Sequence, residues 1–377
     1  MTSKLKLMTI LGTRPEIIRL SEVLKKCDQY FDHILVHTGQ NWDYALNQIF
    51  FDDLELRAPD YYLESVGETL GDTIGNIISK SYKLMSQVRP DALLILGDTN
   101  SALSAIAAKR LKIPIFHMEA GNRCFDENLP EEMNRRIVDH IADVNMCYSE
   151  HARRYLNAEG RPKERTFVTG SPMAEVLAAN LHKIESSSIL ETLGLEKQKY
   201  ILLSAHREEN IDIEKNFFAL MNAVNAMAER YDMPVIYSTH PRSAKFIDLR
   251  NFRFHPNVRS LTPFGFSDYN CLQKNAFCVV SDSGTLPEES SYFRCFPAVC
   301  IRTSTERPEA LDKGNFILGS ITEENVLQAV NVAVEMQDNC DLGAAVPDYV
   351  EENVSVKVVK IIQSYTSVVD KVVWRKA

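Results

Sequence analysis

The chain has 377 residues, more than one hydrophobic core usually holds, so its length predicts two domains. Its formal net charge of −9 comes without a basic stripe, which excludes a nucleic-acid-binding protein. No signal-peptide pattern and no apolar run of about 18 residues occurs, which excludes a membrane-spanning protein and predicts a cytoplasmic one.

Short apolar segments typical of buried strands recur along the chain with helical patterns between them. Near residue 175 a polar helical stretch, AEVLAANLHKIESSSILETLGLEK, separates two series of them. Strands that alternate with helices predict parallel sheets covered on both faces, hence an α/β protein with two doubly wound, Rossmann-like domains facing each other across a cleft. The segments are LKLMTILG, HILVHTG, DALLILGD, IPIFHMEA, VNMCYSE and TFVTGS, then YILLSAHR, MPVIYSTH, VRSLTP, FCVVSDSG and FPAVCI.

Polar residues follow most of these strands at their carboxyl ends. Open parallel sheets bind ligands outside these ends, so we expect the polar groups to line one crevice. Helix capping explains Asp98, Thr99 and Ser283 equally well. Glu119, Arg14 and His206 are not preferred caps, and for them a functional role is favoured. The polar segments are residues 12–16, 37–40, 97–99 and 119–121 in the first half, and 204–207, 238–241 and 281–284 in the second.

Several common chemistries lack their motifs. Neither G-x-G-x-x-G nor G-x-x-x-x-G-K-[ST] occurs, so nothing supports a dinucleotide cofactor or P-loop phosphoryl transfer. No HExxH or paired-cysteine signature occurs either, so we expect no metal and no cofactor. The eight cysteines are scattered, mostly in apolar runs, which favours reduced core thiols over a disulfide framework. Isolated histidines such as His33 and His182 are expected to be surface or core residues.

Two segments fit phosphate or acid/base chemistry and also have ordinary structural explanations. Residues 281–285 follow a buried strand and open the helix LPEESSYF, so backbone N–H groups at Ser283, Gly284 and Thr285 could hold a diphosphate. Glu288 or Glu289 in that helix could accept hydrogen bonds from a ribose diol. A structural turn with an acidic first helical turn is as good an explanation. The segment PEEMNR likewise resembles a helix start with a Glu131–Arg135 ion pair.

Seven motifs together resemble a known family. In chain order they are GTRPE, HTGQNWD, GDTNS, HMEAGNRC with PEEMNR, SAHREEN, SDSGTLPEES and STERPEA, between residues 12 and 310. They are similar to those of the non-hydrolysing UDP-N-acetylglucosamine 2-epimerases. The resemblance implies a glycosyltransferase-B-like fold, a homodimer, and a UDP-2-acetamido sugar as substrate. It also implies an N-terminal domain of residues 1–172, joined by a C-terminal helix at about 358–377, and a UDP-binding domain of residues 173–357.

The family's functional positions carry over residue by residue. We expect four catalytic residues, Asp98, Glu119, Glu131 and His206. We expect UDP or substrate binding by Arg14, Arg19, Arg135, Arg207, Ser283, Gly284, Thr285, Glu289 and Arg307.

The chain departs from the usual family pattern at several places. Arg19 stands where many members have lysine, Glu208 replaces an arginine, and Thr285 replaces a glycine. The short segment GNRCFDENLPEEMNR and the motif HTGQNWD most resemble the UDP-N-acetyl-L-fucosamine synthase branch. That branch converts UDP-2-acetamido-2,6-dideoxy-L-talose to UDP-N-acetyl-L-fucosamine for capsule or O-antigen. The alternative substrate pair is UDP-N-acetylglucosamine and UDP-N-acetylmannosamine.

The implied reaction explains the need for clustered carboxylates. The C2 hydrogen of an acetamido sugar is not next to a carbonyl, so UDP has to leave C1 before a carboxylate can remove it. Inversion then requires acid/base groups on both faces of C2, which Asp98, Glu119 and Glu131 would supply. Arg14, Arg135, Arg207 and His206 would stabilise the departing diphosphate.

Three other functions remain open. A glycosyltransferase would use the same architecture to pass the sugar to an acceptor. A regulator would bind the UDP-sugar without reaction, and a hydrolysing epimerase would release free sugar and UDP.

Overall fold

The computed structural model describes residues 4–39, 44–302 and 305–376, which form two compact units. Unit 1 is Met1–Ala178 with Pro347–Ala377, and unit 2 is Ala179–Val346. The division falls within helix α7 (Met173–Glu185) and at the short helix η3 (Pro347–Tyr349). The domain limits inferred from sequence, 172/173 and 357/358, remain a proposal.

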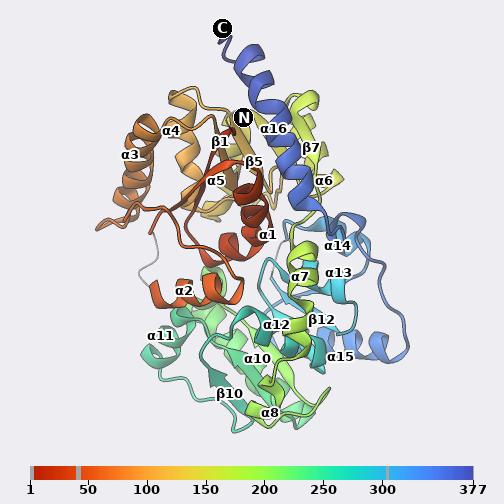
Figure 1. Ribbon diagram of the computed structural model, residues 1–377. Coiled ribbons are helices and arrows are strands. Elements are labelled where there is room, and N and C mark those ends of the chain that lie inside the picture. The colour runs from red at the N-terminus through yellow and green to blue at the C-terminus, as the bar shows by residue number, and fades with distance from the viewer. Residues whose placement is uncertain (1–3, 40–43, 303–304, 377) are drawn as a thin grey trace. The chain divides into compact units, whose positions relative to one another are not determined.

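Unit 1 contains a seven-stranded parallel sheet with the order β3-β2-β1-β4-β5-β6-β7. β4 has the sequence ALLIL and is buried along its whole length, as expected for a strand covered on both faces. α3 and α4 cover one face, and α1 and α16 pack together on the other (Figure 1). The strands are β1 Lys6–Leu11, β2 Asp32–His37, β3 Tyr61–Tyr62, β4 Ala92–Leu96, β5 Ile115–Met118, β6 Val144–Cys147 and β7 Thr166–Val168.

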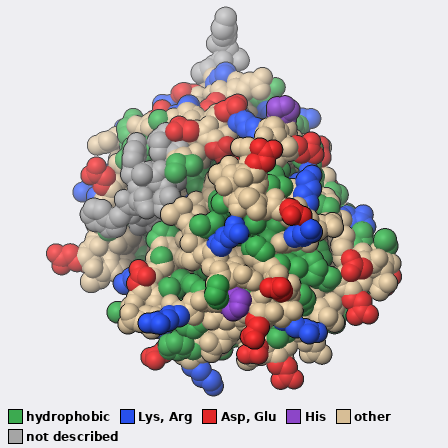
Figure 2. Space-filling view, turned by 90° about the horizontal axis from the view of Figure 1, so that it is seen from below, with side chains coloured by type: hydrophobic (Ala, Val, Ile, Leu, Met, Phe, Trp, Pro, Cys, Tyr) green, Lys and Arg blue, Asp and Glu red, His purple; other side chains and the backbone are tan. Residues whose placement is uncertain are grey.

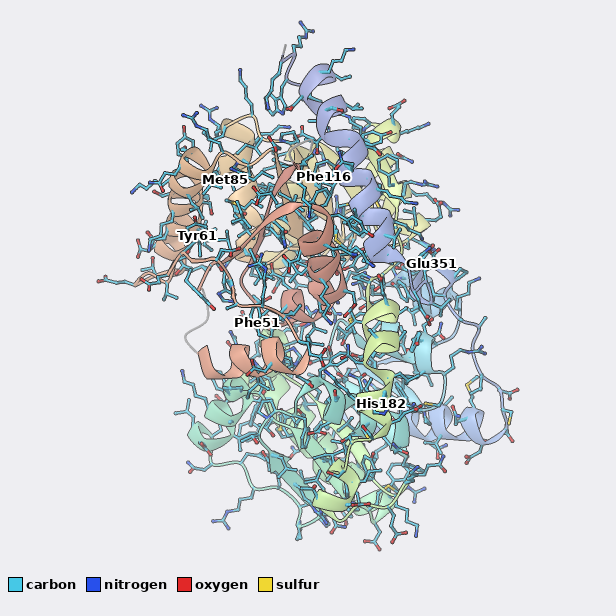
Figure 3. All side chains as sticks on the ribbon, viewed as in Figure 1. Phe51, Tyr61, Met85, Phe116, His182 and Glu351 are labelled. Carbon is cyan, nitrogen blue, oxygen red and sulfur yellow. The ribbon has the colours of Figure 1, made fainter. Side chains whose placement is uncertain are left out.

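The helices of unit 1 follow from apolar spacing and start signals. α1 begins beside Pro15 and buries Ile17, Leu20 and Leu24, which lie three or four residues apart on one face. Met85 of α3 and Phe116 of β5 are also buried in this unit (Figure 3). The helices are α1 Arg14–Tyr30, α2 Tyr44–Asp53, α3 Leu70–Val88, η1 Asn100–Leu103, α4 Ser104–Arg110, α5 Pro130–Ile141, α6 Glu150–Ala158, η2 Lys163–Arg165 and α16 Val354–Val372.

Unit 2 contains a six-stranded parallel sheet with the order β10-β9-β8-β11-β12-β13. Its main core lies between the sheet and the packed helices α10 and α15. The strands are β8 Ile201–Ser204, β9 Val235–Ser238, β10 Val258–Leu261, β11 Cys278–Ser281, β12 Ala298–Ile301 and β13 Ile317–Gly319. The helices are α8 Ile189–Leu193, α9 Glu208–Ile211, α10 Glu214–Tyr231, α11 Pro241–Leu249, α12 Phe266–Asn275, α13 Leu286–Phe293, α14 Pro308–Asp312 and α15 Glu323–Asp338.

The predicted α/β class with two parallel sheets is confirmed, and all eleven predicted strands are present. The sequence pattern does not reveal β3 and β13, because two and three residues are too few for a recognisable apolar run. The helical stretch after residue 173 is two helices, since the chain breaks at Ser186 before α8.

The cysteines, a histidine and the charged side chains can be located in the fold. All eight cysteines are free, and five of them are buried. His182 is exposed on α7 (Figure 3). Acidic and basic side chains are interspersed on the face shown in Figure 2. Over the described ranges, no helix combines the length and apolar character that a bilayer crossing requires.

Candidate active site

The sequence-predicted site residues of unit 1 gather where the strand order of the sheet reverses, between β1 and β4. From β1 the chain runs outward to β2 and β3 on one side, and from β4 to β7 on the other. This switch point is where open α/β sheets bind ligands. β4 and β5 are paired in register, with Leu96 opposite Met118, so the segments that carry Asp98 and Glu119 leave the sheet side by side.

Asp98 is held by an arginine from α5. Nε and Nη2 of Arg135 donate to Oδ2 of Asp98 at 3.0 and 2.6 Å. The next residue toward the N-terminus, Asn134, donates to the backbone carbonyl of Asp98 at 2.9 Å. The Asp98 side chain keeps 20% of its surface exposed, so the carboxylate is both oriented and accessible.

A second carboxylate, Glu132, lies behind this pair and is almost completely buried. Its Oε2 accepts from Nη1 of Arg135 at 2.8 Å, and its Oε1 accepts from Nε of Arg136 at 3.2 Å. Glu132 therefore fixes the guanidinium that holds Asp98. Glu131 occupies the first turn of α5 and is half-buried. The sequence pattern does not single out Glu132, because adjacent glutamates at a helix start look alike until the helix is packed.

Glu119 forms a buried ion pair with Arg19 of α1. Nη1 of Arg19 lies 3.0 Å from Oε1 and 2.8 Å from Oε2 of Glu119, and the two side chains are 10% and 6% exposed. The backbone of Glu119 has a φ of 64°, which is unfavourable for a residue with a side chain and is typical of functional sites. A Cβ added to Gly97 would lie 3.1 Å from Oε2 of Glu119, so this carboxylate lies directly beside the residue that precedes Asp98.

Glu16, in the motif GTRPE, joins the segments that follow β1 and β4. Its carboxylate is 1% exposed and accepts from the backbone N–H of Gly12, from Thr13 and Thr99, and from Ser101. Burial raises the pKa of this carboxyl, although the four hydrogen bonds act in the opposite direction. Glu16 was not predicted as a site residue. The sequence feature that could have identified it is an acidic residue on a mostly apolar helix face.

A fully buried network lies behind Glu119. Oδ1 and Oδ2 of Asp139 accept from the N–H of Gly121 at 3.2 and 3.1 Å, and Oδ2 accepts from Nη1 of Arg123 at 2.7 Å. Nδ1 of His117 lies 2.9 Å from Asp139, while Nε2 of His117 donates to the carbonyl of Gly97 at 2.8 Å. The network thus joins the backbone next to the two carboxylates Asp98 and Glu119. Arg14 lies at the start of α1, with its guanidinium 5.5 Å from the ring centre of Phe50.

Unit 2 places its predicted residues at the corresponding switch point, between β8 and β11. His206 and Arg207 follow β8, and the segment 282–285 follows β11. The carboxylate of Asp282 is completely buried and accepts from the backbone N–H groups of His206 and Arg207 at 3.0–3.1 Å. Nδ1 of His206 lies 3.2 Å from Oδ1 of Asp282.

The segment before α13 forms a turn held by hydroxyl groups. Oγ of Ser283 lies 3.0 Å from Oγ1 of Thr285 and accepts from the Thr285 N–H at 3.3 Å, with Gly284 between them. In α13, Glu289 is 5% exposed and accepts from Nε2 of Gln273 at 2.6 Å.

Three arginines of unit 2 belong to buried or partly buried ion pairs. Arg307, predicted to bind substrate, is completely buried with Nη2 3.7 Å from Oε1 of Glu288. Arg207 lies 3.8 Å from Glu306, which also pairs with Arg302 at 2.7 Å. The motif HTGQNWD includes residues 40–43 and STERPEA begins at residue 304, and these positions lie outside the described part of the chain.

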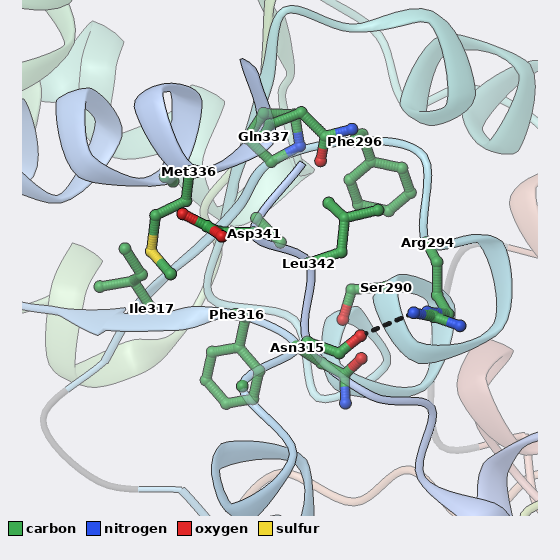
Figure 4. Close-up of a pocket in the computed structure, with 15 residues that line it drawn as sticks. Ser290, Arg294, Phe296, Asn315, Phe316, Ile317, Met336, Gln337, Asp341 and Leu342 are labelled. Carbon is green, nitrogen blue, oxygen red and sulfur yellow. Dashed lines mark hydrogen bonds between the residues drawn. The ribbon is translucent and has the colours of Figure 1, made fainter. Parts of the chain in front are cut away.

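A small cavity of unit 2 lies away from these residues, at the amino ends of β12 and β13 (Figure 4). Its volume of about 70 Å³ is far below the several hundred that a nucleotide sugar needs. Phe296, Asn315 and Met336 are among its lining residues, and Arg294 donates to the Gly343 carbonyl at its edge. Across residues 4–39, 44–302 and 305–376, no group of His, Cys, Asp and Glu side chains has an arrangement suited to a metal ion.

Comparisons with known proteins identify the family. The family model described as UDP-N-acetylglucosamine 2-epimerase matches residues 25–363. The chain belongs to this family. It is an isomerase, a UDP-sugar 2-epimerase.

Named relatives of this epimerase are found among curated proteins and solved structures. A Methanococcus maripaludis protein named UDP-N-acetylglucosamine 2-epimerase homolog is 35% identical, over 96% of this chain and 100% of its own. The UDP-N-acetylglucosamine 2-epimerase structure from Rickettsia bellii is 48% identical over 99% and 100% of the two chains, with a TM-score of 0.91. The Methanocaldococcus jannaschii enzyme, solved with UDP-GlcNAc and UDP, is 30% identical over 95% and 99%, with a TM-score of 0.88.

The comparisons also bear on the fold and on the substrate branch. MurG from Acinetobacter baumannii shares the fold at 14% identity with a TM-score of 0.51, in agreement with the glycosyltransferase-B-like class. The relatives are named UDP-N-acetylglucosamine 2-epimerases, so they support the family and not the narrower fucosamine-synthase branch. The short loop before Pro130 is therefore a weaker guide to substrate than the similarity of the whole chain.

Proposed function

We propose that this epimerase interconverts UDP-N-acetylglucosamine and UDP-N-acetylmannosamine by eliminating UDP and adding it back. The carrying observation is the pair of carboxylates, Asp98 and Glu119, at the ends of adjacent strands, each held by an arginine. The names of the relatives support the choice of sugar.

The proposed reaction has two steps in each direction. In the elimination, the C1–O bond breaks and its electron pair leaves with UDP, while a carboxylate takes the C2 proton and a C1=C2 double bond forms. In the addition, an acid delivers a proton to the opposite face of C2, and an oxygen of the UDP diphosphate bonds to C1. Two carboxylates on different strands can address two faces of one carbon, which a single carboxylate cannot easily do.

Asp98 and Glu119 are the proposed acid/base groups, and Glu131 is a further candidate from the family match. Arg19 and Arg135 keep the two carboxylates oriented and compensate their charge. Arg14 is proposed to contact the substrate at the start of α1.

The UDP group is assigned to residues of unit 2. His206 and Arg207 would stabilise the charge that develops on the diphosphate, and the 283–285 turn would bind it through N–H groups before α13. Glu289 is proposed to accept hydrogen bonds from the ribose, and Arg307 would support α13 through Glu288.

The deciding experiment is proton NMR of the purified protein in heavy water with UDP-N-acetylglucosamine and no acceptor. We expect a second UDP-sugar with the manno configuration and deuterium at C2. Free UDP and free sugar as the main products would indicate a hydrolysing enzyme. An unchanged spectrum would contradict the proposal and favour a binding protein or a transferase.

A second substrate, UDP-2-acetamido-2,6-dideoxy-L-talose, is favoured by one observation, the short segment between Gly121 and Pro130. A parallel incubation with this sugar distinguishes the two. Faster conversion of the 6-deoxy sugar would reverse our assignment, and supply of sugar for capsule or O-antigen would then follow. The homodimer implied by the family resemblance is a further proposal. Size-exclusion chromatography with light scattering tests it.

A further inference from the structure

Asp282 lies directly under His206 in unit 2 and is not among the residues that the family resemblance assigns to the site. It follows β11 in the motif SDSG, and its side chain is completely buried. A buried carboxylate costs free energy unless hydrogen bonds compensate it. The groups that donate hydrogen bonds to Asp282 therefore indicate its role.

Among the described residues, the donors to the Asp282 carboxylate come from one segment, residues 206–210. Oδ1 and Oδ2 accept from the backbone N–H of His206 at 3.1 and 3.0 Å, and Oδ2 accepts from that of Arg207 at 3.0 Å. Nδ2 of Asn210 donates to Oδ2 at 3.1 Å and also to the carbonyl of Ile301. The carboxylate thus fixes the backbone that carries both residues proposed for the diphosphate.

The histidine ring also lies against this carboxylate. Nδ1 of His206 lies 3.2 Å from Oδ1 of Asp282, and a carboxylate oxygen can only accept a hydrogen bond. A proton on Nδ1 is therefore favoured, which leaves Nε2 for the ligand. In the protonated ring Nε2 also carries a proton, which it can donate to a diphosphate oxygen. His206 is 32% exposed whereas Asp282 is not exposed at all, so the histidine and not the aspartate can meet a ligand.

We propose that Asp282 is a positioning residue that orients His206 and keeps a proton on Nδ1, so that the protonated ring can donate from Nε2 to the diphosphate. This inference rests on the proposed function of His206. It assigns Asp282 no contact with the substrate. The carboxylate would act as in other histidine sites, where a buried acid fixes which ring nitrogen carries the proton.

The test compares Asp282→Asn, His206→Gln and the double variant. The amide is isosteric but uncharged, and we expect kcat to fall by about 10- to 100-fold with little change in KM. Because Asp282 acts on His206 and also fixes the Arg207 backbone, the double variant should lose less than the product of the two single losses. Fully multiplicative losses would show that Asp282 acts independently of His206 and would overturn the proposal.

A second measurement reads the tautomer in the wild-type protein and needs no Asp282 variant. Nitrogen-15 NMR of labelled histidine in the wild-type protein should show the proton of the neutral His206 ring on Nδ1. The His206→Gln spectrum identifies the signal. A proton on Nε2 overturns the proposal.

Two controls separate the possible failures. Asp143→Asn changes another buried carboxylate, one that accepts from Lys109 and from the N–H of Ile115, and it should keep normal kcat. If His206→Gln turns over like the wild type, the proposed role of His206 itself is wrong. If His206→Gln is impaired while Asp282→Asn is normal, only the positioning role of Asp282 is wrong.

Discussion

Replacing Arg19 by methionine tests whether the buried pair with Glu119 stabilises the protein. The two side chains are 10% and 6% exposed, and one guanidinium nitrogen contacts both carboxylate oxygens at 2.8–3.0 Å. Removing one member of a buried pair leaves the other charge uncompensated, which typically costs about 3–5 kcal/mol. Arg19→Met should lower the free energy of unfolding by about that amount.

The same geometry predicts a mild effect for Arg19→Lys. Because a single nitrogen of Arg19 makes both contacts, a lysine ammonium could replace it, and we expect a loss of about 1 kcal/mol. Arg153→Met is the matched control, since Arg153 and Glu150 are 37% and 48% exposed. Exposed pairs are worth about 0.2–1 kcal/mol.

Equilibrium urea unfolding followed by far-ultraviolet circular dichroism measures all three variants. Epimerisation of UDP-N-acetylglucosamine, followed by NMR, measures their activity. If Arg19→Met is as stable as Arg153→Met and fully active, the reasoning about the buried pair is refuted.

Asp98→Asn should abolish deuterium incorporation at C2 while UDP still binds by calorimetry; normal exchange would remove Asp98 from the mechanism. Burial lowers the pKa of His37 to about 4, below its ordinary value of 6.5, so the folded state favours the neutral ring. His37 therefore leaves the free energy of unfolding unchanged above about pH 6.5 and lowers it by about 3 kcal/mol as the pH drops to 4. His37→Gln should flatten this part of the pH profile measured by urea unfolding. Gly121→Ala should cost about 2 kcal/mol or more, because φ is 83° and the new Cβ would lie 2.5 Å from the Ala152 carbonyl oxygen. Gly160→Ala, with φ of 77° and no atom within 4 Å, should lose only about 1–2 kcal/mol, and equal losses would contradict the steric argument.

The sequence by itself determined the α/β class and the location of polar groups at strand ends. Apolar runs such as ALLIL can be buried on both faces only in a covered parallel sheet, and the order of strands and helices then limits the topology. The motifs also determined the family, because their order and spacing extend over most of the chain.

Only the tertiary structure decided which charged groups meet. Arg19 and Glu119 are 100 positions apart in the chain, and Arg135 and Asp98 are 37 apart, so local pattern cannot pair them. Glu132 and Asp282 look like ordinary helix-start and turn residues in the sequence. In the fold their carboxylates are buried and lose their hydrogen bonds to water. The nearest donors, Arg135 for Glu132 and the His206 backbone for Asp282, replace those hydrogen bonds and are thereby held in place.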